Sequence, residues 1–226
     1  MRVSAIEGHR LWASVYDSSA NPLLALERRA MGDLLKPLRP SRMIDVACGT
    51  GQWLLHFQRG GSEVFGCDAC REMLSKAMTN VSLQGRVALG DAERIPFSGS
   101  MAELVLCSLS LGYFHNIHRV FVELARASKP GGFVAVSDLH PSALAAGWTR
   151  SFKLGEQRYD LEHYCRSMQQ LESAASNAGL RLKSCHETYF DAPELPLFRY
   201  AGKEELFRTA TSVPALFIGL WEKPCC

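Results

Sequence analysis

The chain has 226 residues, of which 47% are apolar and 21% are charged, a composition that excludes a disordered chain and permits a substantial core. Lysine and arginine number 25 and aspartate and glutamate 23, which gives a formal net charge of +2. This balance provides no broad basic field for nucleic acid or for an anionic membrane surface. No apolar run reaches the ~18 residues of a membrane span, so a soluble globular protein is expected.

The eight cysteines bear on the compartment in which the protein works. A framework of disulfides is typical of small secreted domains, but this chain is large, and its first residues include an acid and a histidine where a signal peptide needs an apolar segment. We therefore expect free thiols and a cytoplasmic location. Cys67 and Cys70 have C-x-x-C spacing but lack a second pair, so neither a metal site nor a redox role is predicted. The terminal Cys225 and Cys226 have no predicted role.

The N-terminal part, residues 1–40, is predicted to be helical. Asn21 and Pro22 combine an N-cap with proline at the first helical position, and residues 23–31 are good helix formers. Two prolines then end the helical segment before residue 41.

From residue 41 onward, short apolar runs alternate with longer helical stretches. Within these runs, polar and apolar residues do not alternate, as expected of strands that are buried on both faces of a parallel sheet. Repeated alternation of strand and helix predicts stacked βαβ units with right-handed crossovers. Strands are expected at residues 43–47, 63–67, 86–89, 104–107, 133–136, 180–190 and 215–221, and helices at 52–59, 71–79, 117–128 and 161–178, with residues 139–160 irregular. The elements predict one α/β domain over residues 1–226, with a mainly parallel, doubly wound sheet and a final antiparallel strand.

A glycine-containing loop, Asp45–Gly51, follows the first predicted strand and reads Asp-Val-Ala-Cys-Gly-Thr-Gly. Its glycines let the backbone turn sharply and approach a ligand closely. Leu54 stands where a dinucleotide fingerprint needs its third glycine, and no Gly-Lys-Ser/Thr follows, which excludes a P-loop. A cationic or zwitterionic ligand suits the acid at position 45 better than a diphosphate.

Two further acids follow the next two predicted strands. Asp68 lies 17 residues after Gly51, near the roughly 20-residue spacing at which an acid meets a ribose hydroxyl. Asp91 follows the third strand. The carboxyl ends of parallel strands form one edge of the sheet, so Asp45, Asp68 and Asp91 are expected at the same ligand crevice. Carboxylates there accept hydrogen bonds from a ribose diol or an adenine amino group.

The loop, the two spaced acids and a Lys129-Pro130-Gly131-Gly132 turn, in this order, resemble the class I S-adenosylmethionine-dependent methyltransferases of the small-molecule type. The resemblance is strong over residues 40–138 and extends over the whole chain by layout. It implies a Rossmann-like sheet of seven strands with helices on both faces. Ala47 departs from the commonest pattern, which has glycine there, and its small side chain should be tolerated. The implied division is a helical cover at 1–40, a cofactor-binding core at 41–138 and a substrate-selecting part at 139–226.

The resemblance also implies roles for single residues. Asp68 would hold the ribose hydroxyls, Asp91 with Ala92 would flank the adenine, and Met73 would cover it. Asp45 is equally open to a structural role within its own loop, because loop aspartates commonly accept from nearby N–H groups. The other implied cofactor contacts are Tyr16, Asp45, Ala47, Cys48, Gly49, Gly51, Ala69, Ser108 and Leu109.

The implied reaction is transfer of the sulfonium methyl group to an O, N, S or C atom of a small molecule, with release of S-adenosylhomocysteine and without a metal. A general base matters for a hydroxyl acceptor, and His115 and His140, after the fourth and fifth predicted strands, are candidates. His163 is expected on a helix as a surface or packing residue. No catalytic residue is assigned, and the acceptor is not predicted.

The near-neutral charge and the glycine loop also bear on the expected partners and on the alternative functions. We expect a small-molecule acceptor, no nucleic acid, no membrane, and a monomer or homodimer. Two alternatives stay open: a nicotinamide-dependent oxidoreductase, which the missing third glycine disfavours, and a catalytically silent S-adenosylmethionine-binding partner of another enzyme.

Overall fold

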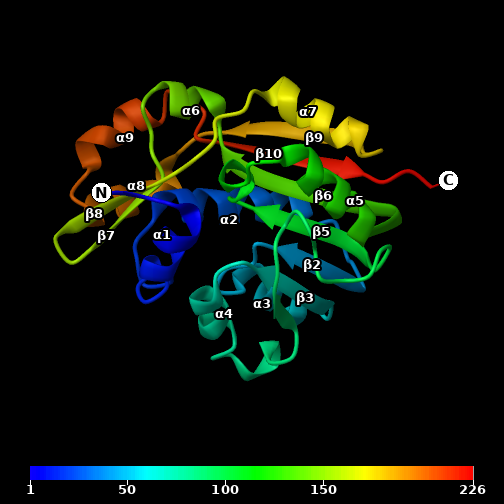
Figure 1. The fold of residues 1–226 in the computed structure, drawn as a ribbon. Coiled ribbons are helices and arrows are strands. Elements are labelled where there is room, and N and C mark those ends of the chain that lie inside the picture. Colours follow the sequence, from blue (N-terminus) through cyan, green and yellow to red (C-terminus); the bar gives the residue numbers. More distant parts are fainter. Residues whose placement is uncertain (226) are drawn as a thin grey trace.

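A seven-stranded sheet forms the centre of the protein, whose structure is a computed structural model that describes residues 1–225 (Figure 1). The last residue, Cys226, lies outside the described residues. The strands of this sheet are β2 (Arg42–Val46), β3 (Glu63–Asp68), β4 (Val87–Leu89), β5 (Ala102–Ser108), β6 (Ser128–Leu139), β9 (Arg181–Thr188) and β10 (Leu216–Glu222). Their order is β4-β3-β2-β5-β6-β10-β9. The first five pair in parallel, and β10 runs antiparallel between β6 and β9. The predicted doubly wound, mainly parallel α/β sheet is confirmed.

Helices cover both faces of this sheet (Figure 1). On one face, α2 (Pro22–Leu35), α3 (Gln52–Arg59) and α4 (Arg71–Ala77) contribute Met31, Leu54 and Leu74 to one apolar cluster. On the other face, α5 (Ile117–Ala127) and α7 (Met168–Asn177) contribute Phe121 and Leu171 to a second cluster. Burial from both sides explains why the strands read as continuous apolar runs.

Local capping fixes where two helices begin. The Asn21 side chain accepts from the N–H groups of Leu23 and Leu24, and Pro22 occupies the first turn of α2, as predicted. The predicted helix at 161–178 starts late, because the Ser167 side chain caps α7 in a capping box. Residues 162–166, which precede it, lie in neither a helix nor a strand.

The prediction of an irregular segment at 139–160 is wrong. This segment holds α6 (Pro141–Ala145) and the hairpin of β7 (Ser151–Leu154) and β8 (Gln157–Leu161). The hairpin joins β1 (Arg2–Val3) in a second sheet of order β1-β8-β7, and α1 (Ala5–Trp12) packs against it. We call α1, β1, β7 and β8 the cap. Its stability comes from a partner far away in the chain: Phe152 stacks between Trp12 and Tyr159, with ring centroids 4.8 Å and 5.2 Å away.

The remaining elements are short and were not predicted. They are η1 (Val81–Leu83), η2 (Leu111–Tyr113), η3 (Ala192–Glu194), α8 (Leu195–Tyr200) and α9 (Glu204–Ala210). None of the described helices is both long enough and apolar enough to cross a bilayer. The seven cysteines of the described part all carry free thiols.

Gly66 and Gly32 differ in the space available for a side chain. A Cβ on Gly66 in β3 would lie 2.7 Å from Leu54 Cδ1 and 2.9 Å from Cys48 Sγ, whereas a Cβ on Gly32 in α2 would meet open space. Gly66→Ala should therefore lower the free energy of unfolding by about 1–3 kcal/mol through overpacking. Gly32→Ala should raise it by about 0.5–1 kcal/mol, because helix interiors favour alanine. Urea unfolding measures both, and effects of the same sign would contradict this packing.

His9 makes the stability of the cap depend on pH. Its Nδ1 lies 2.8 Å from the Ala5 carbonyl oxygen, its ring meets Tyr113 edge-on, and burial lowers its pKa to about 4 from the ordinary 6.5. Since the unfolded chain takes up the proton at higher pH, stability should fall as pH drops from 6.5 towards 4, by up to roughly 3 kcal/mol at about 1.4 kcal/mol per pKa unit. Urea unfolding at pH 7.5 and pH 5 should show a smaller loss for His9→Gln. An equal loss would contradict the assignment.

Candidate functional site

Two adjoining cavities open at the carboxyl ends of β2, β3 and β5. Their volumes are about 510 Å³ and 100 Å³, and we call them the larger and the smaller cavity. Both walls include Tyr16, Ala47, Gly49, Ser108 and Leu109, so these residues mark the junction. The predicted cofactor-binding residues found in one wall or both are Tyr16, Asp45, Ala47, Cys48, Gly49, Asp68, Ala69, Met73, Ala92, Ser108 and Leu109. Gly51 and Asp91 lie in neither wall.

The glycine loop reaches the junction through left-handed backbone. Ala47, Gly49 and Gly51 have φ angles of 59°, 54° and 79°. Alanine is strained in this conformation by roughly 1–2 kcal/mol, and such strain is concentrated at functional sites. Gly51 is the N-cap of α3 and makes no side-chain cap, so the first turn of this helix keeps free N–H groups beside the loop.

Asp68 ties the loop to the next helix. Its Oδ2 accepts from the Gly49 N–H at 2.8 Å, and its Oδ1 accepts from the Cys70 N–H at 2.7 Å. Burial raises the pKa of this carboxyl, and the two N–H donors act in the opposite direction. Each carboxylate oxygen keeps a lone pair for a further donor, and the side chain forms part of the wall of the smaller cavity.

Asp45 is a buried acid without a hydrogen-bond partner at one oxygen. It is 2% exposed, it lies in the wall of the larger cavity, and Oδ1 has no partner among the described residues. Burial raises its pKa most, and the charges of Glu27 and Asp68 raise it further. A buried acceptor needs a donor, so this oxygen fits a ligand group that donates, such as an ammonium.

The N-terminal cover closes over the loop beside these acids. Asp17 Oδ1 accepts from the Thr50 hydroxyl at 2.8 Å and from the Gln52 side-chain amide at 3.2 Å. Tyr16 packs edge-on against Trp12, with ring centroids 4.8 Å apart, and contributes to the walls of both cavities.

The candidate histidines lie away from the junction. His115 is exposed and meets Tyr164 edge-on. His140 accepts from the Ser142 N–H at 3.1 Å as the N-cap of α6, and its Nε2 lies 3.2 Å from Glu187. Neither side chain is in the wall of either cavity.

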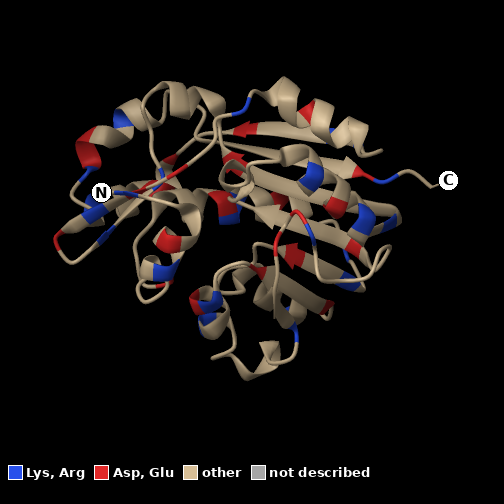
Figure 2. Cartoon of the chain, viewed as in Figure 1, with Lys and Arg blue, Asp and Glu red and all other residues tan. Residues whose placement is uncertain are grey.

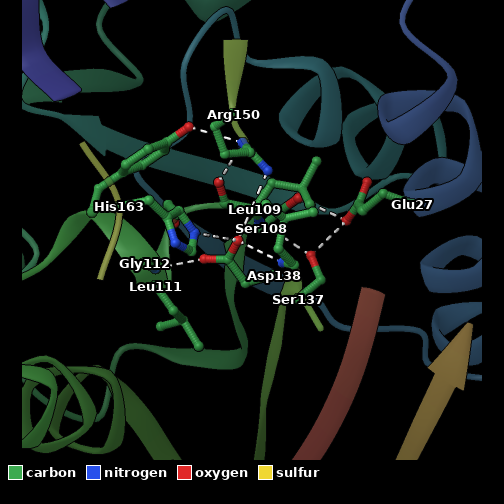
Figure 3. Close-up of polar contacts among 12 residues, drawn as sticks. Glu27, Ser108, Leu109, Leu111, Gly112, Ser137, Asp138, Arg150 and His163 are labelled. Carbon is green, nitrogen blue, oxygen red and sulfur yellow. Dashed lines mark hydrogen bonds and ion pairs between the residues drawn. The ribbon is translucent and has the colours of Figure 1, made fainter. Parts of the chain in front are cut away.

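A buried polar cluster that the sequence did not predict lies beside the smaller cavity, and its Arg150 is part of the cavity wall (Figure 3). Arg150, 6% exposed, donates to the Leu109 carbonyl at 2.8 Å and to the Tyr113 hydroxyl at 2.9 Å, and its Nη1 lies 3.8 Å from Asp138. Arg150 directly precedes β7, so these hydrogen bonds connect the start of the β7–β8 hairpin to the loop after β5. His163, expected on a helix, instead precedes α7; its side chain is 8% exposed, and Nε2 lies 3.3 Å from Asp138.

A nucleic-acid-binding stripe or a metal site would each need a particular grouping of side chains among the described residues. Figure 2 shows Lys and Arg interspersed with Asp and Glu over this view of the molecule, without a stripe of one sign. Within residues 1–225, no group of three or more His, Cys, Asp or Glu side chains is placed to hold a metal ion.

Comparison with known proteins shows the family of the central part of the chain. Residues 44–136 match the methyltransferase domain family. The biotin biosynthesis bifunctional protein BioHC of Cellvibrio japonicus is 31% identical over 132 residues, 58% of this chain and 26% of that protein. The malonyl-(acyl-carrier protein) O-methyltransferase of Pseudescherichia vulneris is 30% identical over 135 residues, 58% of this chain and 52% of that protein. The chain thus spans about half the length, or less, of these curated relatives.

A solved structure shares the fold over most of the chain. The S-adenosylmethionine-dependent methyltransferase from Mesorhizobium loti superposes with a TM-score of 0.62 and 19% identity, over 80% of this chain and 90% of that one. At this identity the likeness establishes the fold. The match to the methyltransferase domain family covers residues 44–136, and the wider chain shares the fold of this S-adenosylmethionine-dependent methyltransferase.

Proposed function

We propose that this chain transfers the methyl group of S-adenosylmethionine to a small-molecule nucleophile and releases S-adenosylhomocysteine. The observation that carries the proposal is the junction of two cavities at a left-handed glycine loop, with the buried Asp45 and the half-buried Asp68 in their walls. S-adenosylmethionine supplies a methyl group on a cationic sulfonium together with an amino-acid ammonium. A wall with buried carboxylates suits such a cation, whereas it disfavours a diphosphate.

The residues in the two walls support the proposal that each cavity holds a different part of S-adenosylmethionine. Asp68 in the smaller cavity is suited to hold ribose hydroxyls, and Met73 and Ala92 provide apolar surface for a base. Asp45, with its partnerless oxygen in the larger cavity, is suited to an ammonium. Asp91 lies outside both walls and accepts from the Glu93 N–H at 2.9 Å, so we assign it to shaping the loop beside the base.

The role of the protein in the reaction is mainly to position the reactants. Because the methyl group arrives already activated, a cover that excludes water and aligns the acceptor supplies the main catalytic effect. We propose that residues 1–40 provide this cover, 41–138 hold the cofactor and 139–226 select the acceptor. The interspersed surface charge favours a small acceptor over nucleic acid, and the free thiols favour a cytoplasmic location. For the assembly we propose a monomer or homodimer.

Calorimetry with S-adenosylmethionine tests the binding site. Asp68→Ala removes the acceptor for ribose hydroxyls and the tie to the loop, so affinity should fall at least ~10-fold, as expected for loss of hydrogen bonds to a charged group worth about 1.5–3 kcal/mol. Glu63→Gln, at the opposite end of the same strand, is the control and should bind like the wild type. Unchanged binding by Asp68→Ala, or binding of NADH in place of S-adenosylmethionine, would overturn the proposal.

A methyl-release assay separates an enzyme from a silent cofactor-binding partner. The protein is incubated with methyl-labelled S-adenosylmethionine and a panel of small hydroxyl, amine, thiol and carboxylate compounds. We expect label to appear in at least one compound, and His115→Ala and His140→Ala to retain turnover because neither side chain reaches the cavities. Tight binding of the cofactor without transfer to any compound would favour the silent partner.

A further inference from the structure

Glu27 is a buried acid that the proposed function has not yet used. It lies on α2, is 3% exposed, and forms part of the wall of the larger cavity. Within the described residues it makes no ion pair. Its Oε1 accepts from the Ser108 hydroxyl at 2.7 Å and from the Ser137 hydroxyl at 3.1 Å, and its Oε2 accepts from the Trp53 indole N–H at 3.3 Å. Figure 3 shows the two serines converging on this carboxylate. A helix of the N-terminal cover thus brings a carboxylate to the ends of β5 and β6.

The direction of these hydrogen bonds determines what Ser108 offers to a ligand. An ionised carboxylate only accepts, so the Ser108 hydroxyl proton is committed to Glu27. Ser108 lies in the walls of both cavities. Its oxygen therefore presents lone pairs at the junction, and a ligand group placed there has to donate a hydrogen. A carboxylate acceptor has no such hydrogen at neutral pH, whereas a hydroxyl has one.

We propose that Ser108, backed by Glu27, takes the proton of the methyl acceptor, and that the acceptor group is a hydroxyl. This inference rests on the proposed methyl transfer. As a lone pair of the acceptor oxygen forms the bond to the methyl carbon, the carbon–sulfur bond breaks and its electron pair returns to sulfur. The acceptor proton passes to Ser108 Oγ while the Ser108 proton passes to Glu27 Oε1. The protonated Glu27 then returns its proton to water once the products leave.

The need for a base selects among the possible acceptors. A thiol ionises by itself near neutral pH, and a neutral amine attacks before it loses a proton. A hydroxyl is a weak nucleophile until its proton is removed as the bond forms, so it gains most from a positioned base. Ser108 is the group that touches the acceptor, and Glu27 is a positioning residue that acts through it.

The charges around Glu27 suit a proton acceptor. Arg28 on the same helix is the cation whose charge acts on Glu27, and the charge of Glu27 in turn raises the pKa of Asp45 on β2 and of Tyr16 in the cover. The donors from α3, β5 and β6 are neutral, and on the far side of α2 Arg29 is paired with Glu194 of η3. Burial raises the pKa of Glu27, which brings it nearer to neutral pH and makes it a better proton acceptor.

A titration of the unliganded protein tests the base directly. Glu27 accepts from the Trp53 indole, so its ionisation should change the fluorescence of that tryptophan. We expect a transition with a midpoint above the ordinary 4.5, present in the wild type and absent in both Glu27→Gln and Trp53→Phe. A transition at or below 4.5, or one that persists in Glu27→Gln, would overturn the proposal whether or not an acceptor is known.

Methyl transfer from labelled S-adenosylmethionine to matched alcohols, phenols and carboxylic acids tests the acceptor class. We expect label in alcohols or phenols, and a loss in kcat of about 10²-fold for Ser108→Ala and Glu27→Gln, the size expected for one general base. The wild-type rate should fall on the acid side as Glu27 takes up its proton, and this fall should vanish in Glu27→Gln. Glu123→Gln, a buried acid on α5 outside both cavities, controls for destabilisation and should keep both rate and profile.

Calorimetry on the same variants separates this inference from the function on which it rests. Ser108→Ala and Glu27→Gln should lose far less affinity for S-adenosylmethionine than they lose in kcat. If they bind it far more weakly but turn over normally at saturation, Glu27 holds the cofactor ammonium beside Asp45, and the proposal is wrong. Methylation of carboxylic acids alone, or an unchanged acid limb in Glu27→Gln, also overturns it. Failure of the wild type to bind S-adenosylmethionine overturns the proposed function itself.

Discussion

The carboxylate of Asp68 holds together the part of the molecule on which the site depends. Parallel pairing brings the ends of β2 and β3 side by side, and the two oxygens of Asp68 then bind the N–H groups of Gly49 and Cys70. The loop is thereby fixed in a left-handed conformation that includes an alanine, and the start of α4 is fixed beside it. Two charge-assisted hydrogen bonds offset this strain. Without them, the walls of both cavities would lose their common boundary.

Two buried carboxylates line the larger cavity. Asp45 and Glu27 line the same cavity, and burial raises the pKa of each. Carboxylates in such surroundings are stable only when a donor or a cation satisfies them. Glu27 finds three neutral donors in the protein, while Asp45 keeps one oxygen without a partner. The difference suggests separate tasks: Asp45 for a cationic ligand, and Glu27 for the proton of the acceptor.

The cavity walls at the carboxyl edge of the sheet could be predicted from sequence because their signals are local. The loop at 45–51 and Asp68 follow strands that their own composition marks, so their place at the sheet edge follows from parallel pairing. The cap could not be predicted in this way. Phe152 and Arg150 read as residues of an irregular segment, since their partners Trp12 and Leu109 lie far away in the chain. Glu27 likewise reads as an ordinary acid on a helix until the fold places two serines against it.

The central claim is that the two adjoining cavities form one cofactor site at the carboxyl edge of the sheet. A crystal structure with S-adenosylhomocysteine tests this most directly. We expect the adenosine in the smaller cavity, with the ribose hydroxyls within hydrogen-bonding distance of Asp68, and the amino-acid end in the larger cavity beside Asp45. A ligand bound elsewhere on the chain, or seated in these cavities without a contact to Asp68, would contradict it.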